Sequence, residues 1–212
     1  GRRIALGLMA RLGASPRLLV LAVMLATAFL SMWVSNTATT AMMTPIAVGI
    51  LAQVVGSHRV RDDRSAATTF TNLQVSLLLG TAYGASIGGV TTLIGSPPNT
   101  VVAAQLDKLT GVTIGFADWL AIGVPIAAVT LPLAWLLLTF VLYPPGDLGV
   151  GEARSAARRQ LAAEGPLEPR GRRVAVIFAI TAGLWVLGGL DFLTGGWLAG
   201  AWQTLLFGGG GA

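Results

Sequence analysis

The sequence predicts an all-α polytopic membrane protein, and three observations predict it. The chain is 54% hydrophobic and only 11% charged, against about 25% charged residues in a typical soluble domain. Its mean hydropathy is +0.74. No charged residue lies between Leu18 and Ser57 or between Ser65 and Leu106, and each of these runs is longer than a transmembrane helix needs.

The formal net charge of +5 does not indicate a nucleic-acid partner, because the basic residues gather in short connections between apolar runs. Such clusters are typical of cytoplasmic loops. We therefore expect a multi-pass protein of the cell inner (plasma) membrane, with the lipid bilayer as its main partner. The chain has no cysteine, which excludes disulfides, thiolate metal sites and a cysteine nucleophile.

Residues 1–17 are predicted to form an amphipathic helix on the cytoplasmic surface, with a plain basic loop as the alternative. Residues 18–56 follow as an apolar run that is broken at Ser35-Asn36-Thr37. Two topologies fit this run: two full spans with the break at the far surface, or a re-entrant helical hairpin with a buried tip. Arginines flank both ends, so the charges do not choose between them.

Residues 65–106 are predicted to form a broken transmembrane helix. A long first half should reach about Ile94, and a short second half should follow the break at Gly95-Ser96-Pro97-Pro98. Gly84 and Gly88 form a small-xxx-small pair on the first half, for which close helix packing is the favoured role.

Charge and hydropathy divide the rest of the chain. The segments are an outer loop at 107–118, a transmembrane helix at 119–143 with Trp119 and Tyr143 as interface anchors, a cytoplasmic loop at 144–173, a transmembrane helix at 174–190 and an unassigned Gly-rich tail at 191–212. Pro125 and Pro132 predict kinks in the helix at 119–143.

The two breaks have the chemistry of an ion site. A helix that stops inside a membrane exposes partly negative carbonyls, and a helix that starts there exposes partly positive N–H groups. Carbonyls with hydroxyls suit Na⁺, and N–H groups with hydroxyls suit a carboxylate or another oxyanion. Ser35, Asn36 and Thr37 are N-cap types, Pro97 suits a first helical turn and Ser96 would cap it.

Each break alone has an ordinary structural explanation, because serine and threonine bond back to helix carbonyls and Pro-Pro ends helices. Two such breaks in consecutive uncharged runs favour a transporter site. No Asp, Glu, Lys or Arg lies within these runs, which argues against a proton relay or a charged gate there.

These residues resemble the divalent anion/sodium symporter family, whose members carry dicarboxylates, citrate or sulfate. Residues 31–47 (SMWVSNTATTAMMTPIA) are similar to the first Ser-Asn-Thr motif of that family. Residues 85–102 (ASIGGVTTLIGSPPNTVV) are similar to its broken fifth helix. The resemblance covers roughly residues 1–190.

The resemblance implies one half of an inverted-repeat elevator transporter that works as a homodimer, and it favours the re-entrant hairpin. By motif position, the first sodium site would be formed by Ser31, Ser35, Asn36 and Gly95. The substrate anion would be contacted by Ser35, Asn36, Thr37, Ser96 and Pro97. It implies no catalytic residue, no enzyme activity and no organic cofactor, with Na⁺ as the co-transported ion.

The chain departs from the family in one respect. Ser35-Asn36 is its only Ser-Asn pair, so the second motif and the second sodium site lie outside it. We expect a fragment that does not transport alone. The predicted function of the intact protein is sodium-coupled transport of divalent anions, most of all C4-dicarboxylates such as succinate, which Thr37 favours over sulfate. The alternatives are a sulfate or oxyanion transporter or exchanger, a passive channel, and a non-transporting membrane enzyme or assembly subunit.

Overall fold

A computed structural model describes most of the chain. The described residues are 7, 10, 15–57, 64–146, 155, 158–159, 161–163 and 169–188. Every regular element within these ranges is a helix. The prediction of an all-α protein is therefore confirmed for the part that is described. The surface helix predicted for residues 1–17 falls almost entirely outside these ranges, as does the tail at 191–212.

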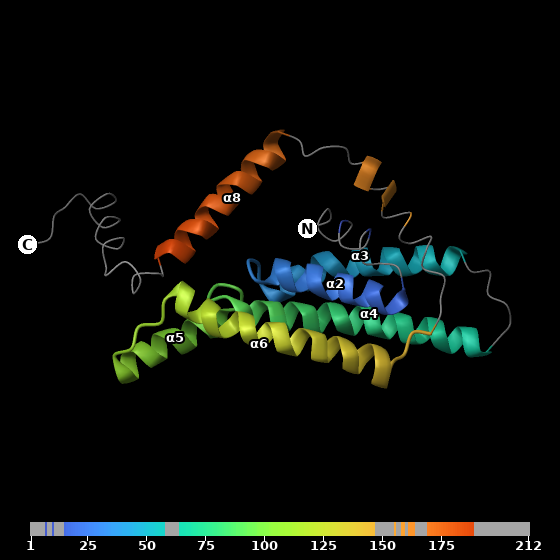
Figure 1. Ribbon diagram of the computed structural model, residues 1–212, viewed down its shortest axis with the longest axis horizontal. Coiled ribbons are helices and arrows are strands. Elements are labelled where there is room, and N and C mark those ends of the chain that lie inside the picture. The colour runs from blue at the N-terminus through green and yellow to red at the C-terminus, as the bar shows by residue number, and fades with distance from the viewer. Residues whose placement is uncertain are drawn as a thin grey trace, which may run out of the picture.

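The elements are α2 (Pro16–Ser31), α3 (Asn36–Ser57), α4 (Arg64–Thr91), α5 (Pro97–Thr110), α6 (Phe116–Leu136), the π-helical segment η1 (Leu137–Leu142) and α8 (Pro169–Gly188). Helices α2, α3, α4 and α6 lie along one another with alternating direction, and both breaks lie at the same end of this bundle (Figure 1). Helix α5 continues past the end of the bundle, and α8 stands apart from it along most of its length.

Helix α2 packs closely on α4, and glycines allow the close approach. A Cβ atom at position 84 would lie 2.8 Å from the carbonyl oxygen of Met24, and one at position 88 would overlap the carbonyl of Ala28. Only a hydrogen in place of a methyl group lets the two backbones meet there. The packing role predicted for Gly84 and Gly88 is confirmed.

The core of the bundle lies between α2, α3 and α4. Its largest fully buried apolar side chains are Leu19, Val20, Val23, Met24, Met43, Leu73 and Leu77, together with Leu138 of η1. The start of α2 is fixed by Ser15, whose hydroxyl oxygen accepts a bond from the N–H of Leu18 at 3.3 Å. Pro16 occupies the first helical position, where its missing N–H costs nothing.

Helix α6 covers α4 on the other side. Its start is fixed by Asp118, whose carboxylate accepts a bond from the N–H of Gly115 at 2.9 Å. At its far end, the indole N–H of Trp135 donates to the carbonyl of Arg17 at 2.8 Å. The guanidinium of Arg17 lies 4.3 Å from the ring centre of Phe140. These contacts tie the beginning of α2 to α6 and η1.

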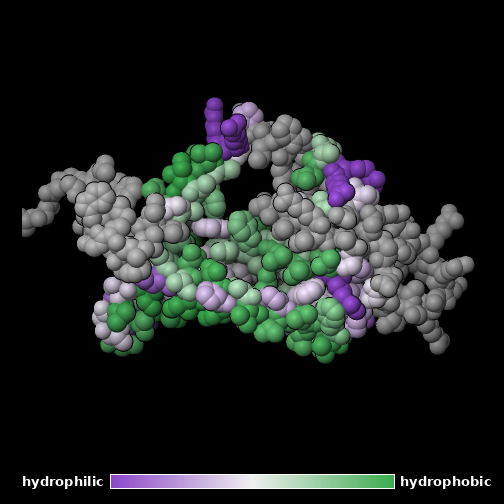
Figure 2. Space-filling view, in the orientation of Figure 1, coloured by the Kyte–Doolittle hydropathy of each residue, from purple (hydrophilic) through white to green (hydrophobic). Residues whose placement is uncertain are grey.

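Two helices of the described part are long and apolar enough to cross a membrane, namely Thr71–Thr91 and Phe116–Leu142. The second also exposes a broad apolar surface, visible as green atoms along the lower face of Figure 2. Ile122, Val129, Leu133 and Val141 are at least half exposed on it. A surface of this kind suits contact with lipid.

Several boundaries differ from those expected. Helix α4 ends at Thr91 rather than near Ile94, and α5 runs on to Thr110 instead of Leu106. The extension of α5 is explained by Gly111, which takes the left-handed conformation at φ 70° and closes the helix. Helix α8 begins at Pro169, inside the connection predicted at 144–173.

Candidate functional site

The first break is a four-residue turn between α2 and α3. The N–H groups of Met32 and Val34 donate to Ala28 O and Leu30 O, each at 3.1 Å, and close the last turn of α2. Helix α3 then begins at Asn36. Ser35 stands just before it, where its hydroxyl oxygen accepts from the N–H of Ala38 at 3.5 Å. The N-cap chemistry predicted for this break is therefore present at Ser35.

The second break lies between α4 and α5. Ser96 is the residue before α5, has an extended backbone, and makes no side-chain bond to the helix that it precedes. The amide of Asn99, which is 6% exposed, reaches back across the break. Its Nδ2 donates to the carbonyls of Gly89 and Thr92, each at 2.8 Å. The end of α4 is thus held by the first turn of α5.

The two breaks touch each other. The hydroxyl of Ser31 is fully buried and donates to Asn36 Oδ1 at 2.8 Å, which ties the end of α2 to the start of α3. Asn36 Oδ1 in turn occupies space that a side chain at position 89 would need. A Cβ atom at position 95 would lie 2.9 Å from the carbonyl oxygen of Ser31. Ser31, Asn36, Gly89 and Gly95 therefore form one cluster, here called the break cluster.

Some of the predicted sodium and substrate residues lie in the break cluster, and the others lie beside it. The structure brings three of the four predicted sodium residues, Ser31, Asn36 and Gly95, into the break cluster. Ser35 and Thr37 are exposed beside it on the turn and on α3. Ser96 is half-buried and Pro97 is exposed at the start of α5.

The oxygen atoms of the break cluster match the ligands that a hard cation prefers. Ser31 offers a hydroxyl and a carbonyl, and Asn36 offers an amide oxygen only 2.8 Å from that hydroxyl. Hard cations take neutral oxygens of this kind as ligands. No Asp, Glu or His stands in the described turns that form the two breaks, so such a site would bind its cation through dipoles alone.

The two helix starts differ in what they offer an anion. In α3, the first helical bond runs from the N–H of Thr39 to Ser35 O at 2.9 Å. The N–H groups of Asn36 and Thr37 come before this bond, so they have no carbonyl partner inside the helix. In α5, the first two positions are Pro97 and Pro98, which have no N–H. N–H donation to an anion is therefore expected from α3, with the hydroxyl of Ser96 as the contribution of α5.

A groove of about 660 Å³, mostly apolar in its lining but with several hydroxyl groups, starts at the first break and follows α3. It is lined by Asn36, Thr37, Thr40, Ala41, Thr44 and Pro45 of α3 and by Ala82 and Ser86 of α4. Its hydroxyl groups continue the polar surface of the turn. The groove connects Asn36 and Thr37 to the outside of the bundle.

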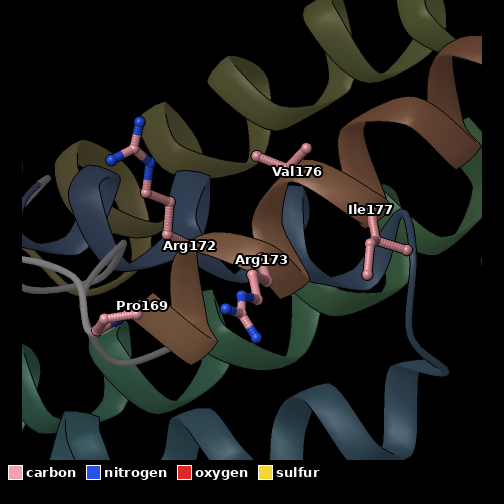
Figure 3. Close-up of a pocket in the computed structure, with 5 residues that line it drawn as sticks. All are labelled: Pro169, Arg172, Arg173, Val176 and Ile177. Carbon is pink, nitrogen blue, oxygen red and sulfur yellow. The ribbon is translucent and has the colours of Figure 1, made fainter.

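A second hollow, of about 510 Å³, lies on α8 (Figure 3). It is lined by Pro169, Arg172, Arg173, Val176 and Ile177, and the two arginine side chains point in different directions. Helix α8 reaches the first break only farther along, where the ring of Phe178 meets Trp33 edge-on at 4.9 Å. The arginines do not belong to the break cluster.

Three residues of this region were not assigned a site role from the sequence: Gly89, Thr92 and Asn99. Asn99 stands three residues after the cap position Ser96, so its place in the first turn of a helix was a usable signal. Thr92 gave no signal, because a threonine near a helix end usually bonds back within its own helix, as Thr91 does to Ile87 O at 3.1 Å.

The sequence of the chain matches a known protein family. Residues 1–198 match the family described as "Sodium:sulfate symporter transmembrane region". The sodium-dependent dicarboxylate transporter SdcS of Staphylococcus aureus (strain USA300) is 32% identical over 184 residues, which are 87% of this chain and 35% of the relative. An uncharacterized transporter of Haemophilus influenzae is 47% identical over 125 residues, which are 59% of this chain and 23% of the relative. The chain thus spans about a third or less of the length of these relatives.

Proposed function

Because the chain belongs to the sodium:sulfate symporter transmembrane family, which is a family of membrane transporters and not of enzymes, we propose that its protein carries divalent anions across the plasma membrane together with Na⁺. The observation that carries this proposal is the break cluster. Two interrupted helices, each polar at its interruption, meet at Ser31, Asn36 and Gly95. Paired broken helices of this kind mark the sites of secondary transporters.

We assign the sodium ion to Ser31, Ser35, Asn36 and Gly95. Support comes from the neutral oxygens gathered by the break cluster and from the C-terminal end of α2, whose carbonyls are partly negative. A site without a carboxylate holds Na⁺ only weakly, so the ion can be released after each cycle. No organic cofactor is required by this chemistry.

We assign the anion to Ser35, Asn36, Thr37, Ser96 and Pro97. The exposed start of α3 supports this assignment, because it offers first-turn N–H groups and the exposed hydroxyls of Ser35 and Thr37, which suit a negative ligand. C4-dicarboxylates such as succinate are the proposed substrates. The relative in Staphylococcus aureus, a sodium-dependent dicarboxylate transporter, supports that choice.

The proposal includes a topology. Helices α2 and α3 form a re-entrant hairpin, and α4 with α5 forms a broken span whose interruption lies at the level of the hairpin tip. Support comes from α5, which continues beyond the break for 14 residues. We further propose that the full-length protein is a homodimer with an elevator motion, and that the second sodium site belongs to sequence beyond this chain.

Uptake of radiolabelled succinate tests the proposal. In proteoliposomes that contain the full-length protein, an inward Na⁺ gradient should drive uptake and a K⁺ gradient should not. The double change Ser35→Ala with Asn36→Ala should abolish it, because it removes a hydroxyl and an amide oxygen from both assigned sites. Sodium-driven uptake that persists in this double variant would refute the site assignment.

The same assay separates the remaining alternatives. Competition by unlabelled sulfate would identify an oxyanion transporter of the same fold. Release of internal anion in exchange for external anion, without Na⁺, would identify an exchanger. Anion flux that needs neither Na⁺ nor exchange would identify a passive channel.

A further inference from the structure

Thr92 occupies a special position between the two breaks. It follows the last residue of α4 and its side chain is fully buried. Its hydroxyl donates to the carbonyl oxygen of Met32, at the end of α2. The same hydroxyl oxygen accepts a bond from the N–H of Gly95 at 3.0 Å. One side chain therefore bonds to the first break and to the second.

The neighbouring contacts show what this pair of bonds fixes. Gly95 lies against Ser31, since a Cβ atom at position 95 would be 2.9 Å from Ser31 O and 2.6 Å from Gly89 O. Met32 directly follows Ser31 in the chain. The Thr92 hydroxyl thus holds the backbone of residues 31–32 at a set distance from the backbone of Gly95.

Other threonines at buried helical positions do not do this. Thr27 and Thr81 donate to the carbonyls of Val23 and Leu77, one turn earlier in their own helices, at 2.7 and 2.8 Å. Thr91 does the same. Thr92 instead joins two segments that are 60 residues apart in the chain. A bond of this kind stabilises a tertiary arrangement and not a helix.

We infer that Thr92 is a positioning residue for the sodium site: its hydroxyl couples the hairpin break to the α4–α5 break and so sets the spacing of the oxygens of Ser31 and Asn36 relative to Gly95. This inference rests on the proposed function of the break cluster. In this account Thr92 acts by holding the backbone around the site and not as a ligand, and its hydroxyl already makes two bonds within the protein.

The consequence is a selective loss of sodium affinity. Thr92→Val keeps the shape of the side chain but removes the hydroxyl that bonds to Met32 O and to the N–H of Gly95. The N–H of Gly95 then keeps only its longer bond to the backbone oxygen of Thr92, at 3.3 Å. We expect the Na⁺ concentration for half-maximal succinate uptake to rise roughly tenfold, as the loss of one buried hydrogen bond predicts. The maximal rate at saturating Na⁺ should change much less, because the anion donors at the start of α3 are untouched.

The experiment measures succinate uptake against Na⁺ concentration in proteoliposomes of the full-length protein. Thr91→Val is the matched control, since it removes a neighbouring buried hydroxyl that bonds only within α4. Its half-saturation should stay at the wild-type value. Thr92→Ser keeps the hydroxyl but removes the methyl group, and it should keep most of the sodium affinity. If the effect of Thr92→Val came from altered packing, Thr92→Ser would also lower the affinity. If Thr92→Val does not fold, Thr92→Cys, with its weaker donor, should give a smaller rise.

Two failures are distinguishable. Wild-type uptake that is independent of Na⁺ would overturn the proposed function and this inference with it. Sodium-driven wild-type uptake, combined with equal half-saturation in the Thr92 and Thr91 variants, would overturn the inference alone.

Discussion

Asn36 is the residue on which the break cluster depends, and its position depends on a glycine in another helix. Its Oδ1 accepts from the Ser31 hydroxyl and rests on the backbone at Gly89. Any side chain at position 89 would take the space of that oxygen. Gly89 therefore leaves room for the amide oxygen of Asn36, whereas Gly84 and Gly88 let the backbones of α4 and α2 approach each other.

Gly89→Ala should displace the Asn36 amide and weaken sodium binding. We expect the Na⁺ concentration for half-maximal uptake to rise by roughly tenfold or more, since both the Ser31 bond and the oxygen position are lost. Gly49→Ala is the control, because a Cβ atom there meets nothing within 4 Å. Equal half-saturation in the two variants would show that Asn36 does not hold the ion.

At the residue scale, the sequence was sufficient to indicate which polar side chains belong to the candidate site, but not the groups to which they bond. Ser31, Asn36 and Gly95 follow from the motif resemblance, and the structure brings them together. Thr92 could not be found in this way, because its two bonds reach Met32 and Gly95 across a tertiary contact. No local pattern distinguishes it from Thr91.

At the scale of the elements, α2 and α4 form a closely packed pair to which the break cluster is attached. The glycines of α4 bring its axis close to α2, and the closest approach is at Gly88, next to Gly89 of the break cluster. The small-xxx-small spacing of Gly84 and Gly88 predicted close helix packing, but it did not identify α2 as the partner. The sequence did not predict the ends of α5 and α8, since a charged residue such as Asp107 is as compatible with a helix end as with a loop.

Gly88→Ala should destabilise the protein by roughly 1–3 kcal/mol, because the new methyl group meets the rigid backbone of Ala28. Thermal unfolding in detergent measures this as a lower melting temperature. Gly80→Ala is the matched control on the same face of α4. Its methyl group would meet the flexible side chain of Met24 at 3.0 Å, so a smaller loss is expected. Equal losses at both positions would contradict the close-packing account.

At the scale of the whole molecule, the topology places the site. Helices α2 and α3 turn back at the level where α4 is interrupted, and α5 continues past that level (Figure 1). The sequence alone left two topologies open, because the arginines before and after the hairpin lie on the same side in both. The structure adds that the two breaks are in contact, which no charge pattern can reveal. The re-entrant alternative remains the proposed one, and it rests on α5, which continues for 14 residues beyond the break.

Single-cysteine labelling tests the central claim, which is that the two breaks meet inside the membrane at a site for sodium and a divalent anion. The chain itself has no cysteine, and any cysteine elsewhere in the full-length protein is first replaced by serine. Ala38→Cys puts a thiol on an exposed position in the first turn of α3, and Leu109→Cys puts one at the far end of α5, where Leu109 is 80% exposed.

The measurement is the rate of reaction with a membrane-impermeant thiol reagent added from outside to the full-length protein. The account predicts fast labelling at position 109 that ligands do not change, and slow labelling at position 38 that Na⁺ with succinate suppresses further. Labelling at position 38 as fast as at position 109, and unaffected by Na⁺ with succinate, would place the turn at the outer surface and contradict the account.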